Sequence, residues 1–295
     1  MSPATDEPTA ALRNLGAQLK DLRARAGLDQ ATLASVLGVA QPQISRLENG
    51  RRLPPVPVIR EWVRACAAAD GSEFDAEPLI ALREAAGGER VSWQRIHRNG
   101  LAADQHSLGG VEAQAQEIRV FQSSVIPGQL QTASYAQRLF ELGTSKTPDE
   151  VVAGVQARLE RQAILYHPPE HGCRFLISEA ALRWRPTGDD GTLIAAQLDR
   201  LLALLDLPGI DIGLLPWEEP QPATHRHPFV LYRLPDDQDD MVIVETIDGE
   251  NVVRDADLIA LYVSWYDRLA SAAWTGQRAR DFLHRLLEEV QITNR

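Results

Sequence analysis

Apolar side chains recur at three- and four-residue spacing through the first part of the chain, a pattern that is typical of helices with one buried face. Four short series follow one another, over residues 12–22, 29–37, 41–48 and 59–66. Glycines end the first two series, and the proline-rich run LPPVP separates the third from the fourth. This spacing predicts a compact all-α bundle of short helices close to the N-terminus.

Later residues mix helical spacing with short runs of β-branched and other apolar side chains. The runs CRFLIS, IDIGLLP, PFVLYRL and MVIVETI predict strands over residues 173–178, 210–216, 228–234 and 241–247. The acidic link PDDQDD between the last two runs favours a hairpin. Helices are expected over residues 133–142, 149–166, 192–206, 255–272 and 276–290. Helices around a small, mostly antiparallel sheet make this second part an α+β domain.

These patterns divide the chain into four parts. They are a disordered N-terminus at residues 1–10, a helical bundle at 11–70, a helical linker at 71–107 and an α+β domain at 108–295. The expected fold class is therefore α+β overall, with an all-α bundle at its N-terminal end.

Composition and cysteine content indicate where such a protein works. With 44% hydrophobic and 24% charged residues, the chain has an ordinary soluble globular composition. Cys66 and Cys173 are too few for a disulfide framework, which favours a reducing location. No apolar run approaches the ~18 residues that cross a bilayer, and MSPATDEPTA lacks the form of a secretory signal. We therefore expect a cytoplasmic protein with no membrane partner.

Charge is distributed unevenly along the chain. The formal net charge is -11, yet residues 1–66 hold nine lysines and arginines against six acidic residues. The other residues hold 21 basic and 35 acidic side chains. Because charges beyond a Debye length of ~8 Å are largely screened, a basic N-terminal part can meet a polyanion although the whole chain is acidic. The charge therefore permits nucleic-acid binding but does not prove it.

Residues 41–48 have the types of side chain that a DNA-reading helix needs. A recognition helix in the major groove needs apolar anchors on its inner side, here Ile44 and Leu47, and hydrogen-bonding side chains on its outer side. Glutamine pairs with adenine edges and arginine with guanine edges. Base reading is expected from Gln30, Gln41, Gln43, Ser45 and Arg46, and phosphate contacts from Thr32, Asn49, Arg51 and Arg52. The alternative is a bundle of four or five helices that has no role on DNA.

The segment from residue 12 to residue 68 resembles the xenobiotic-response-element family of helix-turn-helix regulators, which includes the phage repressors. The resemblance implies a lambda-repressor-like bundle. It is carried by Gln30, Leu33, Ala34, Leu37, Gly38, Val39, Gln41, Ile44, Ser45, Glu48, Gly50 and Arg52. In phage-repressor relatives two glutamines cooperate, one bracing the other against an adenine, and Gln30 and Gln41 occupy those positions. Ala40 departs from the family, which often caps the recognition helix with Ser or Thr. Glu48 is interpreted as a brace of the bundle through arginines.

Residues 91–290 resemble a C-terminal domain of uncharacterised function that follows this kind of bundle in actinobacterial regulators. The motif is carried by Glu112, Ala115, Ile118, Ile126, Pro127, Gly128, Leu130, Gln131, Thr132, Tyr135 and Ala136. The resemblance implies a transcriptional regulator of the antitoxin-like, Scr1 type, often found beside a small partner protein.

Polar and aromatic side chains near this motif are candidates for an effector pocket. They are Gln129, Gln131, Tyr135 and Trp184. The alternative for the turn IPGQLQT is that it docks a helix against the sheet, and the alternative for the tryptophan is core packing.

Motifs of catalysis and metal binding are missing from the sequence. It contains no Walker loop, no GxGxxG after a strand, no HExxH and no GxSxG. His167, His171 and Cys173 have metal-binding side chains, but two prolines prevent a helical presentation and no fourth ligand is evident. We therefore expect a protein that is not an enzyme and has no cofactor and no metal site.

Together these observations predict a sequence-specific transcriptional regulator that binds double-stranded DNA. One short recognition helix covers about half of an operator, so we expect a homodimer on a pseudo-palindromic site with half-sites about one helical turn (~34 Å) apart. The C-terminal domain would then supply dimerisation and sense a small-molecule effector or a small neighbour-encoded protein. The alternative is an antitoxin-like interaction module that sequesters a small partner protein and autoregulates its own operon.

Overall fold

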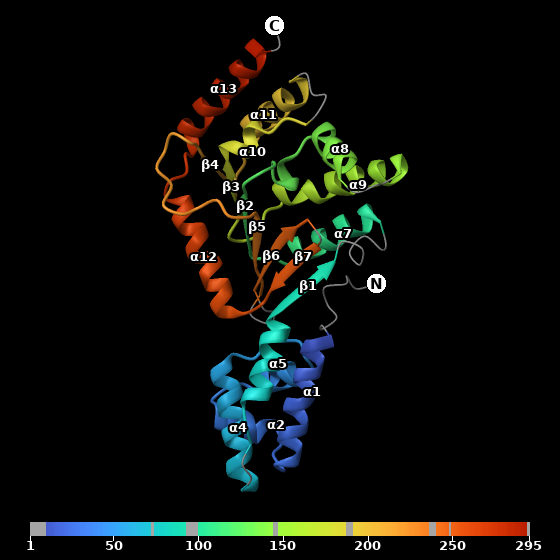
Figure 1. The fold of residues 1–295 in the computed structure, drawn as a ribbon, viewed down its shortest axis with the longest axis vertical. Coiled ribbons are helices and arrows are strands. Elements are labelled where there is room, and N and C mark those ends of the chain that lie inside the picture. The colour runs from blue at the N-terminus through green and yellow to red at the C-terminus, as the bar shows by residue number, and fades with distance from the viewer. Residues whose placement is uncertain are drawn as a thin grey trace.

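The computed structural model describes residues 10–71, 74–92, 100–143, 147–186, 191–235, 240–247 and 249–293. Figure 1 shows two parts, a small helical head (residues 10–87) and a larger body (residues 88–293), joined where a helix of the head runs into a strand of the body. Most of the expected disordered segment, residues 1–9, lies outside the described residues.

The head is a bundle of five helices among the described residues. They are α1 (Ala10–Arg25), α2 (Gln30–Leu37), α3 (Gln41–Glu48), α4 (Val56–Asp70) and α5 (Glu77–Gly87). The carboxylate of Asp29 accepts the Thr32 N–H at 2.7 Å and so caps α2. Ala40 makes no side-chain cap for α3, but Pro42 occupies its first turn, where a missing N–H costs nothing.

Glycines let the end of α3 press against α1. A β-carbon at Gly16 would lie 2.7 Å from the Leu47 carbonyl oxygen, and one at Gly50 would lie 2.8 Å from the Leu12 carbonyl oxygen. Gly50 also has a φ of +65°, in the left-handed region that favours glycine. The close backbone contact fixes α3 against the rest of the head.

The body is built on one mixed sheet. Its strands are β1 (Gly88–Ser92), β2 (Glu117–Gln122), β3 (Cys173–Ser178), β4 (Ile210–Leu215), β5 (Phe229–Arg233), β6 (Met241–Thr246) and β7 (Gly249–Val253). The described strands lie in the order β1-β7-β6-β5-β2-β3-β4. Strands β2, β3 and β4 run parallel, and the other neighbours pair antiparallel.

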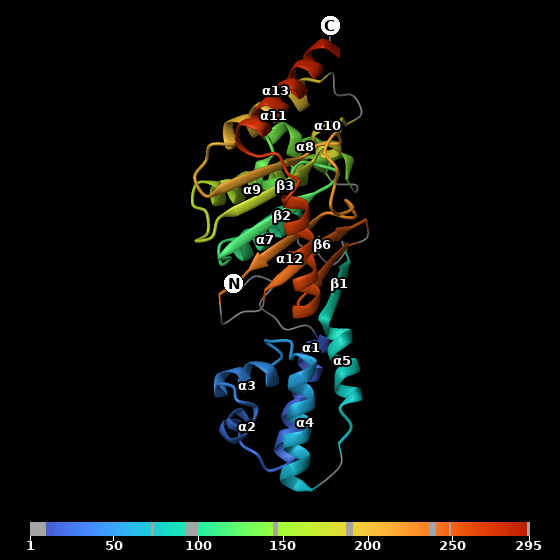
Figure 2. The ribbon, with the colours of Figure 1, turned by 90° about the vertical axis from the view of Figure 1, so that its left-hand side faces the viewer.

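Helices cover both faces of this sheet, as Figure 2 shows. On one face lie α7 (Leu101–Glu112), α8 (Ala133–Leu142), α9 (Pro148–Arg161), α10 (Glu179–Arg183), α11 (Thr192–Leu204) and α13 (Gly276–Thr293), with short 3-10 helices at Gly128–Leu130 (η2) and Gln162–Leu165 (η3). The other face packs on α12 (Ala256–Ala270). No helix among the described residues is long and apolar enough to cross a membrane.

The predicted α+β class is confirmed, and each of the four predicted strands is present within one residue of its expected ends. The hairpin across the acidic link is also confirmed, because β5 and β6 pair antiparallel. The sheet is nevertheless larger than expected, since strands at 88–92, 117–122 and 249–253 were not predicted. Strand β2 is buried along its whole length, so its side chains lack the alternation that marks a half-exposed strand.

The expected linker at residues 71–107 is divided between the two parts. Leu79, Ile80 and Ala86 of α5 belong to the hydrophobic core of the head. The next residues form β1, which pairs with β7 at the edge of the sheet. The two parts are therefore joined by regular structure on both sides of residue 87.

Arg83 of α5 ties the head to the body. Its Nε donates to the carbonyl oxygen of Pro54 at 3.2 Å, and its guanidinium forms an ion pair with Asp255. Asp255 in turn caps α12 by accepting the N–H groups of Asp257 and Leu258 at 2.9 and 3.0 Å. Both side chains of the ion pair are buried. A single buried arginine thus connects the turn after the recognition helix to the start of α12.

Candidate nucleic-acid interface

Four side chains form a hydrogen-bonded relay that ends at the exposed start of α3. The buried carboxylate of Glu48 pairs with Arg23, whose NH2 donates to Oε2 at 3.0 Å. Gln30 Nε2 donates to the same oxygen at 2.7 Å. Gln41 Nε2 then donates to Gln30 Oε1 at 2.7 Å. The interpretation of Glu48 as a brace through an arginine is confirmed, and Gln30 contacts Gln41 as the family resemblance implies.

This relay fixes which hydrogen-bonding groups the first turn of α3 offers to a ligand. Because Gln41 donates one N–H to Gln30, its carbonyl oxygen and second N–H keep the direction set by that bond. A glutamine side chain held in this way is suited to the N6 and N7 atoms of an adenine. Arg23 also donates to the carbonyl oxygen of Leu28 at 2.7 Å, so the buried end of the relay is firmly held.

The residues of α3 that are predicted to read bases differ in exposure. Gln41 is exposed, whereas Gln43, Ser45 and Arg46 are half-buried. Ile44 and Leu47 are buried in the core of the head, as expected for the anchors of a recognition helix.

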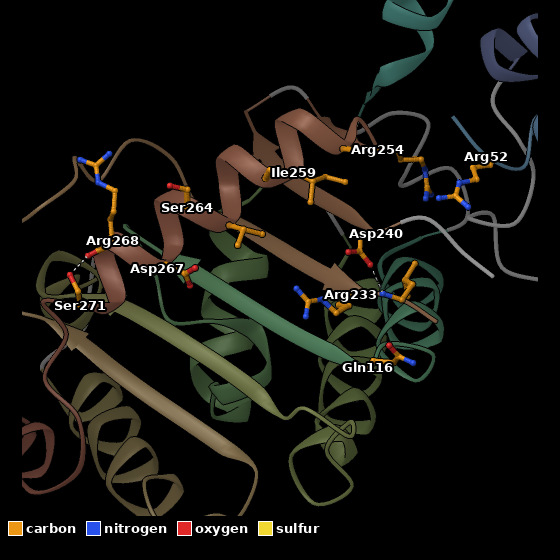
Figure 3. Close-up of a pocket in the computed structure, with 14 residues that line it drawn as sticks. Arg52, Gln116, Arg233, Asp240, Arg254, Ile259, Ser264, Asp267, Arg268 and Ser271 are labelled. Atoms are coloured by element: carbon orange, nitrogen blue, oxygen red, sulfur yellow. Dashed lines mark hydrogen bonds between the residues drawn. The ribbon is translucent and has the colours of Figure 1, made fainter. Parts of the chain in front are cut away.

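The residues predicted to contact phosphate divide into two groups. Thr32, Asn49 and Arg51 are exposed, and the Asn49 side chain donates to the Ser45 carbonyl oxygen at 2.7 Å. Arg52 is half-buried and lines a groove between head and body, close to Arg254 (Figure 3). The structure therefore places Arg52 at the junction as well as next to α3.

The residues predicted to form an effector pocket lie together but are packed into the body. Gln129, Gln131 and Tyr135 are buried, and the rings of Tyr135 and Trp184 meet edge to face with centroids 5.9 Å apart. None of the four lines the groove between head and body. Their contacts are those expected if the turn docks a helix against the sheet, which was the alternative reading of this motif.

A buried polar network explains why the motif of the body contains so many amides and charges. Glu112 accepts from Gln129 at 2.5 Å and pairs with Arg161 at 2.9 Å. Arg158 donates to Gln131 at 2.8 Å. Burial raises the pKa of Glu112, and Arg161 opposes that rise. These contacts join α7, η2 and α9. The sequence matched these residues to a family but did not reveal their chemistry.

An acidic pair near this network gives the body a pH-dependent stability. Glu245 and Glu250 lie opposite each other on β6 and β7. Burial, followed by the charges of Glu245 and Asp104, raises the pKa of Glu250 to about 7. The unfolded value is about 4.3. The folded state therefore holds the proton more tightly, and this contribution to stability is complete below about pH 4.3 and is lost as the pH rises through about 7.

We expect Glu250→Gln to raise the melting temperature at pH 8 and to reduce its change between pH 5 and pH 8. The amide stays neutral, so no carboxylate is forced to ionise beside Glu245. The measurement is thermal unfolding of the full chain across this range, with Glu288→Gln on the exposed side of α13 as control. A constant difference between variant and wild type at all pH values would contradict the assignment.

Comparison with known families finds matches for both parts of the chain. Residues 105–285 match the family described as a domain of unknown function, DUF5753. Residues 14–76 match a family described as a helix-turn-helix domain. The first match covers more than half of the chain, and the second covers the relay and the whole of α3.

Other comparisons add little. No curated protein matches the chain. A solved structure of TrmBL2, an archaeal chromatin protein described as showing a novel mode of DNA binding, is similar at 11% identity. The similarity covers 84% of this chain and 88% of that one with a TM-score of 0.32. At this TM-score the likeness carries no argument about fold or function.

Proposed function

Because the chain belongs to the family that shares the domain of unknown function DUF5753, and a helix-turn-helix domain precedes that domain, we propose that it is a sequence-specific DNA-binding transcriptional regulator. In this proposal α3 lies in the major groove and the body regulates how the head binds. The protein acts in the cytoplasm and is not an enzyme.

The observation that carries the proposal is the relay from Arg23 through Glu48 and Gln30 to Gln41. A bundle that served only as a scaffold would gain nothing from orienting an exposed glutamine. Here a buried ion pair holds Gln30, and Gln30 holds the amide at the start of an exposed helix. Such pre-organisation is what base reading requires, since each good bidentate contact is worth about 1–3 kcal/mol of discrimination.

The test begins with an operator selected from random duplex DNA by the wild-type chain. Gln41→Ala is expected to weaken operator binding by about 1–3 kcal/mol while leaving binding to random DNA nearly unchanged, because base contacts carry the specificity. Arg51→Ala provides the contrast. It is expected to weaken both DNAs alike and to lower the slope of log K against log salt by about one.

Gln156→Ala on the exposed side of α9 is the control for the glutamine substitution and should match wild type. The proposal fails if the wild-type chain selects no DNA in a salt-sensitive, sequence-dependent way. It also fails in its assignment of roles if Gln41→Ala and Arg51→Ala lose affinity equally for operator and random DNA.

We propose further that the regulator binds as a homodimer on a pseudo-palindromic operator. A helix of eight residues spans about 12 Å and reads only a few base pairs, so two copies are needed to specify a site. Footprints with two protected half-sites about 10 base pairs apart would support this arrangement. A fully active complex with one copy per operator would contradict it.

An antitoxin-like partner protein is the second candidate. Its support is the outer side of α9, where Val152 is 66% exposed and Leu159 38% exposed, one above the other at heptad spacing. Apolar side chains in this position suit a helical partner. Val152→Glu should abolish a complex with the product of the neighbouring gene and leave DNA binding unchanged, and an unchanged complex would contradict this candidate.

A further inference from the structure

An open groove of about 1030 Å³ runs along α12 of the body, and Arg52 is the residue of the head among its described lining (Figure 3). Arg52 reaches it from the turn after α3, and one side of α12 forms its long wall. Arg233 at the end of β5 and Asp240 before β6 lie opposite that wall. The groove is therefore built from segments that lie almost 200 residues apart in the chain.

The groove is positively charged although the body is acidic. Its described lining holds four arginines, Arg52, Arg233, Arg254 and Arg268, and two aspartates. Groups of both signs have partners within the protein: Arg268 donates to the Pro222 carbonyl oxygen and lies over the Trp265 ring, and Arg233 lies 3.8 Å from Glu117. Asp267 pairs with Arg119 at 2.8 Å, and Asp240 accepts the Leu234 N–H at 2.9 Å. The lining thus has an excess of positive charge, which favours an anion.

The wall that α12 forms is apolar along its first half and polar along its second half, where Ser264, Asp267, Arg268 and Ser271 line the groove. Ala256, Ile259, Ala260 and Val263 face it from α12 at the spacing of one helix side. Small-molecule sites typically combine such a wall with a few charged groups and have volumes of about 300–1,000 Å³. A DNA backbone has phosphates but no use for an apolar wall. The lining therefore suits a small organic anion better than a second stretch of DNA.

The position of the groove connects it to the recognition helix. Arg52 follows the end of α3 by four residues, while Arg254 comes directly before the capping residue of α12. The same two segments are already joined by Arg83, which contacts Pro54 and Asp255. A ligand held by Arg52 and Arg254 would add a second connection between the head and the body at this point.

We propose that the groove binds a small organic anion with an apolar portion, and that the bound ligand fixes the orientation of the head on the body. The ligand contacts arginines of both parts through its anionic group and α12 through its apolar portion. This inference rests on the proposed function for its regulatory meaning, since a fixed head changes the affinity for an operator only if the head binds one.

The probe is 8-anilinonaphthalene-1-sulfonate, an aromatic sulfonate that fluoresces when its rings leave water. We expect saturable binding of one molecule per chain in the absence of DNA. The double variant Arg233→Gln/Arg254→Gln should raise the dissociation constant at least about ten-fold, because two charge-assisted contacts are lost. Ala260→Trp should abolish binding by filling the groove from an exposed position on α12.

Arg285→Gln is the matched control, because Arg285 lies on α13 with an exposed ion pair to Glu218 at 3.0 Å. Melting temperatures confirm that all variants are folded. The probe should also change operator affinity of the wild-type chain and not that of Ala260→Trp. Equal probe affinity in wild type, the double variant and Ala260→Trp would overturn the proposal, as would the absence of saturable binding.

The outcomes separate this inference from the proposed function. If the wild-type chain selects an operator but every variant binds the probe equally well, the proposed function stands and the proposed ligand site is wrong. If the chain binds the probe in the groove but selects no DNA, the proposed ligand site stands and the proposed function is wrong. If the double variant loses DNA affinity with a smaller salt slope and keeps its probe affinity, the arginines contact the DNA backbone and the ligand proposal is wrong.

Discussion

Replacing Glu48 with alanine is expected to lower the free energy of unfolding by about 3–5 kcal/mol. The carboxylate is 1% exposed and pairs with Arg23, which is 12% exposed. Removing Glu48 leaves the half-buried Arg23 guanidinium with the Leu28 carbonyl oxygen as its one hydrogen-bond acceptor among the described residues. The measurement is urea denaturation of the full chain, followed by the helical signal in circular dichroism.

Glu61→Ala is the matched control, since Glu61 forms an ion pair with Arg64 on the surface of the same head, with both side chains more than half exposed. Glu61→Ala should lower the free energy of unfolding by less than about 1 kcal/mol, because water already solvates both charges. Similar losses for the two variants would contradict a structural role of the Glu48 carboxylate. Glu48→Ala should also lose operator discrimination wherever it remains folded, because Gln30 no longer has a fixed acceptor.

The second large effect is expected for Gly50→Ala, which should lower the free energy of unfolding by about 3 kcal/mol. The residue has a φ of +65°, which costs a side-chain-bearing residue about 1–2 kcal/mol. The new methyl group would also lie 2.8 Å from the Leu12 carbonyl oxygen and 2.9 Å from Arg13 backbone atoms, so α1 and α3 must move apart. Overpacking of this kind costs a further 1–3 kcal/mol, roughly.

Gly38→Ala separates these two costs. Its φ is +67°, almost the same, but no atom lies within 4 Å of the position that a β-carbon would take. Gly38→Ala should therefore lose only the conformational part, about 1–2 kcal/mol. Both variants are compared in the same urea denaturation experiment. If they lose equal stability, the close contact between α1 and α3 contributes nothing and the expectation for Gly50 is wrong.

Local sequence patterns were sufficient to predict the helices of the head, because these helices follow from the spacing of neighbouring residues. The spacing of apolar residues placed α1 to α4, and the residue types in α3 pointed to base reading. The relay also joins residues at positions that a family pattern marks, namely Gln30, Gln41 and Glu48. The pattern did not show that Arg23, 25 residues before Glu48, completes the relay.

The body was less predictable because its decisive contacts are distant in the sequence. Strand β2 contains Glu117 and Arg119, which argue against a buried strand when they are seen alone. In the structure Glu117 pairs with Arg119 at 3.0 Å and with Arg174 of β3 at 3.2 Å. Charges from neighbouring strands and α12 neutralise each other, so a strand with charged residues lies in the interior of the sheet, between β5 and β3.

The junction between head and body shows the same limit. Arg83 stands in an apolar series with Leu79 and Ile80, and a charged residue at that position signals a buried partner. The partner itself is Asp255, 172 positions later, and no local pattern identifies it.

By itself, the sequence determined the helix-turn-helix head and the α+β character of the body, because helix and strand periodicity are properties of neighbouring residues. The tertiary structure alone decided the order of the seven described strands, the buried partners of Glu48, Glu112 and Arg83, and the groove beside Arg52. These features arise where distant segments exclude water together, so each depends on the whole fold rather than on any one stretch of the chain.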